Sequence, residues 1–226
     1  MSTAQTRLLA EPATFYQDSI GKKLIMAVSG LVLFGFVGAH LYGNLHVYLG
    51  PESFNDYVES LRATPELLWA VRATVLVAVL LHVWSAVQLS LLKKAARPVG
   101  YSRWTSQDTS YASRTMMWSG PILAAFIVYH LLHMTLGTVH PSFDYENVYQ
   151  NFIIGFSSPL VVVAYVVSMV MLGMHLRHGI WSMFQTVGFS HPTYTPWLKT
   201  LAWVVSTVIV LGFVSMPVSV LVGILR

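Results

Sequence analysis

The chain has 226 residues, of which 55% are hydrophobic and only 10% are charged. Soluble domains carry about 25% charged residues, so this composition excludes an ordinary soluble protein and indicates a polytopic membrane protein. The sequence contains no cysteine, which excludes disulfides, iron–sulfur ligation by this chain and thioether-linked haem.

Five apolar windows follow one another along the chain, each long enough to cross a hydrocarbon core of about 30 Å as a helix. They cover residues 24–47, 68–92, 115–139, 155–183 and 198–223. Residues 1–21 are expected to form a cytoplasmic tail, and the loop 50–66 is predicted to hold a short surface helix. Pro121 is expected about one turn inside the third helix, where its missing amide proton matters least. We therefore predict a single all-α domain, residues 1–226, that forms a bundle of five transmembrane helices.

Lysine and arginine gather on one side of the predicted bundle. With the N-terminus inside, ten of the thirteen flank the inner helix ends: Arg7, Lys22, Lys23, Lys93, Lys94, Arg97, Arg103, Arg114, Arg177 and Lys199. Cytoplasmic loops carry such an excess, so we expect the N-terminus inside and the C-terminus outside. These residues would face anionic lipid at the cytoplasmic surface, which explains the net charge of +4. We therefore do not expect nucleic acid as a partner.

Nine histidines occur in the chain, while no Asp, Glu or Lys lies deep inside a predicted span. Proton pumps, cation transporters and voltage sensors place carboxylates or cations at membrane depth. Imidazoles without carboxylates favour metal or haem ligation instead.

Two of the deep histidines are predicted to lie in the outer half of the membrane. At a rise of about 1.5 Å per residue, His40 lies about 27 Å from Lys22, and His130 lies about 24 Å from Arg114. Both distances start at the cytoplasmic helix end, so the two residues form an outer pair.

Two further histidines are predicted to lie in the inner half. His82 is about 16 Å from Lys93, and His175 precedes the inner end of its helix, near Phe184, by about 13 Å. Four helices thus supply two pairs at two levels, as two bis-histidine b haems would need. A haem with two axial imidazoles is six-coordinate, so its function is one-electron transfer.

Other interpretations of these histidines remain open at this stage. A histidine in a membrane helix also bonds across helices, and small residues occur at ordinary helix contacts. His133 and His178 lie one turn beyond His130 and His175, and spacing does not choose between them. Small residues near the ligands would let a flat macrocycle approach the backbone: Gly35, Gly38, Ala39, Gly173 and Gly179. His46, His140 and His191 are interpreted as solvated residues at interfaces or in loops.

Five segments in order carry a resemblance to a known family. They are "SGLVLFGFVGAHLYGN", "LLHVWSAVQL", "KKAARPVGY", "SGPILAAFIVYHLLHMTLG" and "GMHLRHGIWSMFQTVG". With them, nearly the whole chain resembles the single-subunit dihaem cytochrome b that anchors bacterial succinate dehydrogenase or fumarate reductase, complex II. The resemblance implies His40 and His130 as outer ligands and His82 and His175 as inner ligands.

The resemblance also implies cofactors, partners and a location. The cofactors are two haem b groups and a quinone, menaquinone or ubiquinone, while FAD and iron–sulfur clusters belong to partner subunits. A flavoprotein and an iron–sulfur protein would dock on the cytoplasmic face of a bacterial cytoplasmic membrane. Electrons would pass from succinate to quinone in the respiratory chain and tricarboxylic acid cycle, or in reverse from quinol to fumarate. The fourth helix has no carboxylate beside His175, which favours succinate oxidation.

The quinone and propionate contacts have two interpretations each. Glu59 and Glu66 follow the first helix and are candidates for proton exchange with quinone, or simply solvated loop charges. Arg72, Arg114 and Arg177 would suit haem propionates, or they extend toward lipid headgroups.

Two other classes of protein compete with this interpretation. In a transporter or channel the histidines would relay protons, but deep carboxylates and repeat symmetry are missing from the sequence. Hydrogenase and ferric reductase cytochromes usually carry two haem ligands on one helix, whereas here four of the five predicted helices supply one each.

Overall fold

The computed structural model of the chain describes residues 18–96 and 111–226. Within these ranges, five helices are long and apolar enough to cross a membrane, which confirms the predicted fold class. They are α1 (Ser19–Leu45), α3 (Pro65–Ala95), α4 (Tyr111–His130), α6 (Pro159–Thr186) and α7 (Thr195–Leu221). The predicted tail before residue 18 lies outside the described residues.

Proline marks the start of most of these helices. Pro65 and Pro159 are the first residues of α3 and α6, and Pro196 is the second residue of α7. Pro51 likewise begins the shorter helix α2 (Pro51–Arg62). Proline suits these positions because the first amide groups of a helix have no partner within it and because its φ is already helical. Gly50, with φ of 97°, provides the turn that precedes α2.

Four shorter elements complete the described chain: η2 (His46–Leu49), α2 (Pro51–Arg62), the π-helical turn η3 (Leu131–Thr135) and α5 (Val148–Gly155). The surface helix predicted in loop 50–66 is confirmed as α2. The predicted start of the fourth span at residue 155 was wrong, because the short helix α5 ends there and α6 begins four residues later.

The predicted place of Pro121 was also wrong. Helix α4 begins at Tyr111, so Pro121 lies in the middle of the helix and not one turn from its start. The third span ends earlier than predicted as well, since η3 closes at Thr135 with a bond from the amide of Leu136 to the carbonyl of Leu131. That five-residue step is the π-helical spacing.

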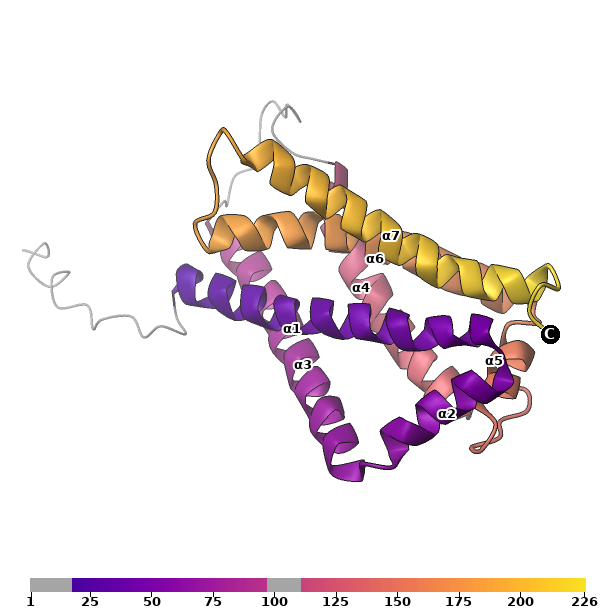
Figure 1. Ribbon diagram of the computed structural model, residues 1–226. Coiled ribbons are helices and arrows are strands. Elements are labelled where there is room, and N and C mark those ends of the chain that lie inside the picture. The colour runs from indigo at the N-terminus through magenta and orange to yellow at the C-terminus, as the bar shows by residue number, and fades with distance from the viewer. Residues whose placement is uncertain (1–17, 97–110) are drawn as a thin grey trace, which may run out of the picture.

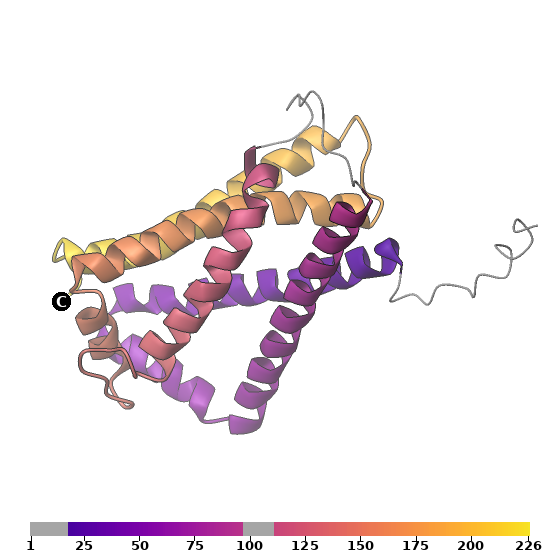
Figure 2. The same ribbon diagram turned by 180° about the vertical axis from the view of Figure 1, so that it is seen from behind.

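The long helices form two groups by direction. In Figure 1, α1, α6 and α7 run side by side, while α3 and α4 cross them at an angle; Figure 2 shows the same from behind. Helix α1 packs on α3, α6 and α7, and α4 packs on α6. Helices α1 and α3 diverge toward the end at which α2 connects them.

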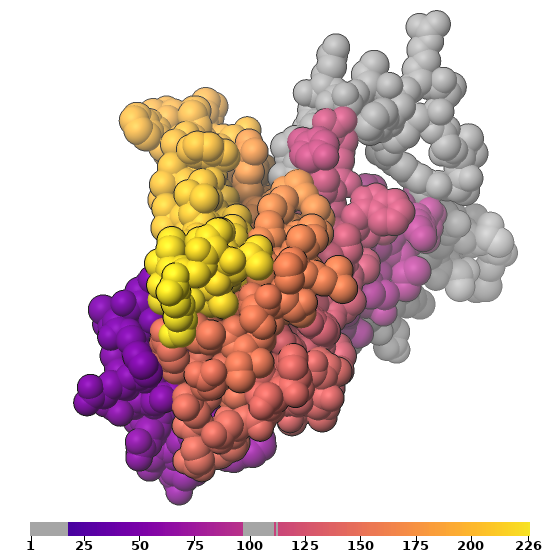
Figure 3. All heavy atoms as spheres, turned by 90° about the vertical axis from the view of Figure 1, so that its right-hand side faces the viewer, coloured from indigo at the N-terminus to yellow at the C-terminus, as the bar shows by residue number. Residues whose placement is uncertain are grey.

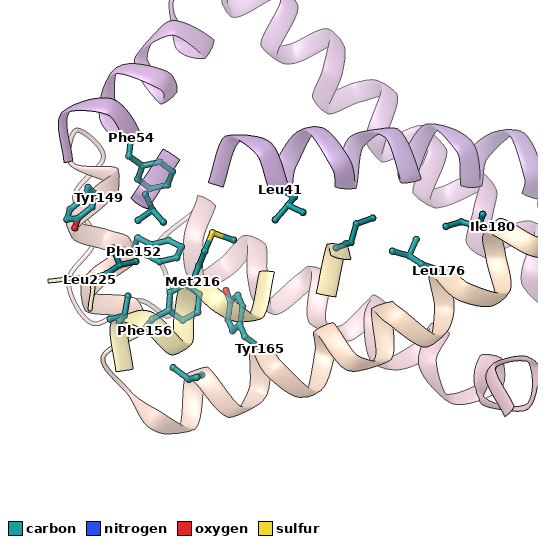
Figure 4. Packing of buried hydrophobic residues seen from close by; sticks show 14 of the residues in the cluster. Leu41, Phe54, Tyr149, Phe152, Phe156, Tyr165, Leu176, Ile180, Met216 and Leu225 are labelled. Carbon is teal, nitrogen blue, oxygen red and sulfur yellow. The ribbon is translucent and has the colours of Figure 1, made fainter. Parts of the chain in front are cut away.

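An aromatic core closes the end of the bundle that carries α2 and α5, which we call the outer end. Phe152, Phe156, Tyr165 and Met216 are buried there and lie together in Figure 4. The C-terminal residue is tied to this end, because the hydroxyl of Tyr149 donates to the last backbone carbonyl at 3.1 Å. Figure 3 shows this end, with the yellow C-terminal segment against the orange chain of α5 and α6.

Large apolar side chains are exposed along all five long helices, for example Leu80 and Leu160 at 60% and 79% exposure. Such surface is stable only against lipid or another apolar partner. Together with the five helices, it identifies a multi-pass membrane protein.

Candidate functional site

The outer pair of histidines is brought together by α1 and α4. The ring centroids of His40 and His130 lie 5.8 Å apart, with the ring planes at 80°. Phe36 stacks on His40 at 5.4 Å, and Phe126 stacks on His130 at 5.8 Å. Each phenyl ring lies one helical turn before its histidine and shields one face of the imidazole from water.

The inner pair comes from α3 and α6. The ring centroids of His82 and His175 lie 6.0 Å apart, with the planes at 59°. The ring of His82 lies directly on α1, where a Cβ added to Gly30 would approach its Cε1 atom to 3.3 Å. A glycine at position 30 therefore permits α1 and α3 to pack with the imidazole between them.

Three helices independently place the two pairs at different levels. On α4, Ser119 contacts the inner His175 and precedes the outer His130 by eleven residues, or about 16 Å. On α6, Tyr165 contacts His130 and precedes His175 by ten residues, or about 15 Å. On α1, Gly30 lies against His82 and precedes His40 by ten residues. The two pairs therefore lie about 15 Å apart along the helices.

The tautomer of His82 follows from its hydrogen bonds. Its Nδ1 lies 3.3 Å from the backbone oxygen of Met26, which can only accept, so Nδ1 carries the proton. Nδ1 is also 3.4 Å from Oγ of Ser29, whose own proton goes to the carbonyl of Ile25 at 2.7 Å. The lone pair is therefore on Nε2, as metal binding through that atom requires.

Two of the other three rings also have their hydrogen bonds at Nδ1, and the third does not. Nδ1 of His175 lies 3.4 Å from Oγ of Ser119, and Nδ1 of His130 lies 3.2 Å from the hydroxyl of Tyr165. In these two rings and in His82, the hydrogen bonds are made at Nδ1. His40 differs, because the amide of Asn44 lies 3.3 Å from its Nε2 and also donates to its backbone oxygen at 2.7 Å.

The number of ligands in each pair suits haem better than a bare metal ion. Metal sites built from protein alone use three or four ligands, and the described residues contain no group of three or more His, Cys, Asp or Glu that could hold an ion. Haem iron takes two axial protein ligands at most. With metal–nitrogen bonds of about 2.0 Å, two axial imidazoles have ring centroids about 6 Å apart, close to both distances found here.

His133 and His178, which spacing alone could not exclude as ligands, lie outside these pairs. His133 is buried at 1% exposure, and its Nδ1 lies 3.0 Å from the hydroxyl of Tyr165. Its ring lies 5.2 Å from that of His140, which is buried and not solvated as predicted. His178 is half-buried on α6.

The structure separates the glycines that the sequence grouped together. A Cβ on Gly173 would come within 2.6 Å of Val210, so this residue serves the contact between α6 and α7. A Cβ added to Gly35, Gly38 or Gly179 would meet no atom within 4 Å. These three, and not Gly173, leave open space beside the helix.

The three arginines predicted to bind propionates are all exposed. The guanidinium of Arg72 lies 5.1 Å from the Trp69 ring, and that of Arg114 lies 5.8 Å from the Tyr111 ring. Such contacts fit side chains that extend along the bundle surface. The propionate role of Arg72, Arg114 and Arg177 stays a prediction.

The two glutamates predicted near the quinone are exposed at the outer end, Glu59 in α2 and Glu66 in the first turn of α3. A recess of about 540 Å³ lies beside α2, but other residues line it: His46, Leu49, Glu52, Ser53, Asp56 and Tyr57. The ring of His46 stacks on Tyr57 at 4.6 Å. Sequence reasoning missed Glu52 and Asp56, although their spacing of four residues places them on one helical face.

A comparison with protein families matched residues 93–214, more than half of the chain, to the family described as succinate dehydrogenase/fumarate reductase transmembrane subunit. The chain belongs to this family. The match includes two of the paired histidines, His130 and His175, and begins beyond His40 and His82. Comparisons with curated proteins and with solved structures gave no match. As a transmembrane subunit of this family, the chain anchors soluble subunits of complex II at the membrane.

Proposed function

We propose that this membrane subunit holds two b haems and carries electrons between the iron–sulfur subunit of succinate:quinone oxidoreductase and a membrane quinone. The observation that carries the proposal is the pair of facing imidazoles at each of two levels. At three of the four histidines, Nδ1 rather than Nε2 makes the hydrogen bonds. Bound haem supplies one-electron transfer at a six-coordinate iron.

The chain's own residues would bind, orient and shield the haem. His40, His82, His130 and His175 would be the axial ligands. Met26 and Ser29 hold the ring of His82, and Ser119 holds that of His175. Hydrogen bonds at the remote nitrogen fix the ring orientation and raise the basicity of the ligand. Phe36, Phe126 and Phe213, whose ring centroids lie within 6.0 Å of an outer imidazole, exclude water there.

The partners follow from the same proposal. The flavoprotein with FAD and the iron–sulfur subunit would dock at the inner end, in the bacterial cytoplasmic membrane. One of the two inner loops, 97–110, lies outside the described residues. Quinone would bind near the outer end, with Glu59 and Glu66 as the candidates for proton exchange. We propose succinate oxidation as the direction, because no carboxylate lies beside His175 on α6.

The first test is a haem count on the purified complex. We expect a reduced-minus-oxidised spectrum with a b-type α band, and two haems for each copy of this chain by pyridine haemochrome assay. A complex without haem, or with a single haem, would contradict the proposal. Rates of succinate oxidation and fumarate reduction with menaquinone and ubiquinone analogues would then establish direction and quinone.

A further inference from the structure

Tyr165 of α6 lies between two histidines of the third span. Its hydroxyl is 3.2 Å from Nδ1 of His130 and 3.0 Å from Nδ1 of His133. The ring is 6% exposed and is held by edge contacts with Phe126 and Phe156, at 5.0 and 4.7 Å. In Figure 4, Tyr165 projects from α6 toward the aromatic core, so the hydroxyl has a fixed position.

The direction of these two hydrogen bonds follows from iron binding. A neutral imidazole that binds iron through Nε2 carries its proton on Nδ1. Nδ1 of His130 therefore donates to the oxygen of Tyr165, and the single hydroxyl proton of Tyr165 goes to Nδ1 of His133. The opposite direction would place the proton of His130 on Nε2, where it would prevent ligation.

The surroundings of His133 favour its role as the acceptor of the Tyr165 proton. Its ring stacks on Tyr129 at 5.5 Å, and a Cβ on Gly155 would lie 3.1 Å from its Cε1 atom. His140 offers it no acceptor, because its Nδ1 accepts from the amide of Ser142 and its Nε2 donates to a backbone oxygen. Nε2 of His133 is buried without a hydrogen-bond partner among the described residues. Among the described residues, the hydrogen bond to Tyr165 is thus the one that the His133 ring makes.

We propose that Tyr165 is a positioning residue for the outer haem ligand, and that His133 supports it by accepting the tyrosine proton. This inference rests on the proposed function. An acceptor at Nδ1 makes the imidazole of His130 more electron-donating and favours ferric over ferrous iron. Because Tyr165 itself donates to His133, its oxygen is a stronger acceptor than an isolated phenol. The chain of two bonds lowers the reduction potential of the outer haem.

The test is a redox titration of the purified complex with Tyr165→Phe. We expect the outer haem to be reduced more easily, with the reduced-to-oxidised ratio at a fixed potential rising about three- to tenfold; a tenfold change equals about 59 mV for one electron. The inner haem should not change. Tyr129→Phe is the matched control, because the ring of Tyr129 packs on both Tyr165 and His133 while the hydrogen bonds described above run between Tyr165 and the two histidines.

A second pair of variants tests the inference even if Tyr165→Phe fails to retain the outer haem. His133→Leu removes the acceptor of the Tyr165 proton and should raise the reduction potential of the outer haem by less than Tyr165→Phe does. His133→Asn keeps an acceptor at this position, so its outer haem should have the potential of the unmodified protein. If both haems are present and neither Tyr165→Phe nor His133→Leu shifts the outer potential, the inference is wrong while the proposed function stands. Equal potentials in His133→Leu and His133→Asn would also overturn it. Absence of haem from the unmodified complex would instead contradict the proposed function.

Discussion

At the scale of single residues, the inner site is fixed by backbone as much as by side chains. His82 contacts the carbonyl of Met26 and the glycine at position 30, both on α1. These contacts leave the imidazole only one tautomer and little room to rotate. The imidazole of His82, proposed as an inner haem ligand, is therefore held in a fixed orientation by the protein alone.

His82→Ala should remove the inner haem and leave most of the outer haem in place. The outer ligands lie about 15 Å away along the helices, so they keep their own contacts. The measurement is the haem content and the visible spectrum of the purified complex. His191→Ala, in an exposed loop, is the control and should retain both haems. Loss of both haems, or of neither, in His82→Ala would contradict the assigned pairs.

At the scale of elements, a buried amide side chain helps to hold the segment between η3 and α5 in place. Asn151 of α5 is 3% exposed; its side chain donates to the carbonyl of Asp144 at 2.5 Å and accepts from the amide of the same residue at 2.8 Å. His140 donates to the backbone oxygen of Asn151 at 2.8 Å. These bonds fold the outer loop back onto α5 and place His140 beside His133.

Asn151→Ala should release this loop without removing either haem. The variant loses two hydrogen bonds to the backbone of Asp144, which costs about 2 kcal/mol at about 1 kcal/mol each. Cleavage by chymotrypsin after the exposed Tyr145 should become faster, as measured by gel analysis of the purified complex. Gln150→Ala, on the exposed face of the same helix, should be cleaved at the rate of the unmodified protein. Equal rates for both variants would mean that Asn151 does not restrain the loop.

At the scale of the whole molecule, orientation in the membrane rests on the distribution of lysine and arginine. The bundle has two distinct ends, one with α2, α5 and the C-terminus, the other with the connection between α6 and α7 (Figure 1). The chain contains no cysteine, so a single introduced cysteine reports on one position.

Ser142→Cys should react with a membrane-impermeant maleimide in intact cells, because it is expected on the outer side. Ser190→Cys, between α6 and α7, should react only after the membrane is permeabilised. Both serines are exposed, so any difference in labelling reflects sidedness. The reverse pattern would show that the N-terminus lies outside.

The sequence predicted the parts of the fold that depend on local properties. The five spans follow from apolar length, and α2 follows from helix-forming residues between Gly50 and Pro65. The pairs His40 with His130 and His82 with His175 came from depth, which needs only the helical rise. The family match agrees with the resemblance seen in the sequence, over the shorter range 93–214.

Other features depend on contacts that depth does not determine. Ser119 and Tyr165 contact histidines on neighbouring helices, and no local pattern shows which way a side chain faces. His133 lies three residues after His130 and looked interchangeable with it, but the π-helical turn η3 and the contact with Tyr165 give it a different place. His140 was interpreted as a solvated loop residue, and no pattern in the sequence singled out Asn151, which lies eleven residues later in α5.

Helix α1 takes part in both histidine sites, since it provides a ligand candidate at His40 and the surface on which His82 rests at Gly30. The segment between these two positions is therefore a spacer of fixed length and fixed rotation. Each added residue would advance one site by about 1.5 Å and turn it by about 100° relative to the other. Substitutions within residues 31–39 keep this spacing and rotation, although Phe36 also serves the outer pair through its stacking on His40, whereas insertions and deletions change both. The number of residues in this segment is thus constrained separately from the identity of their side chains.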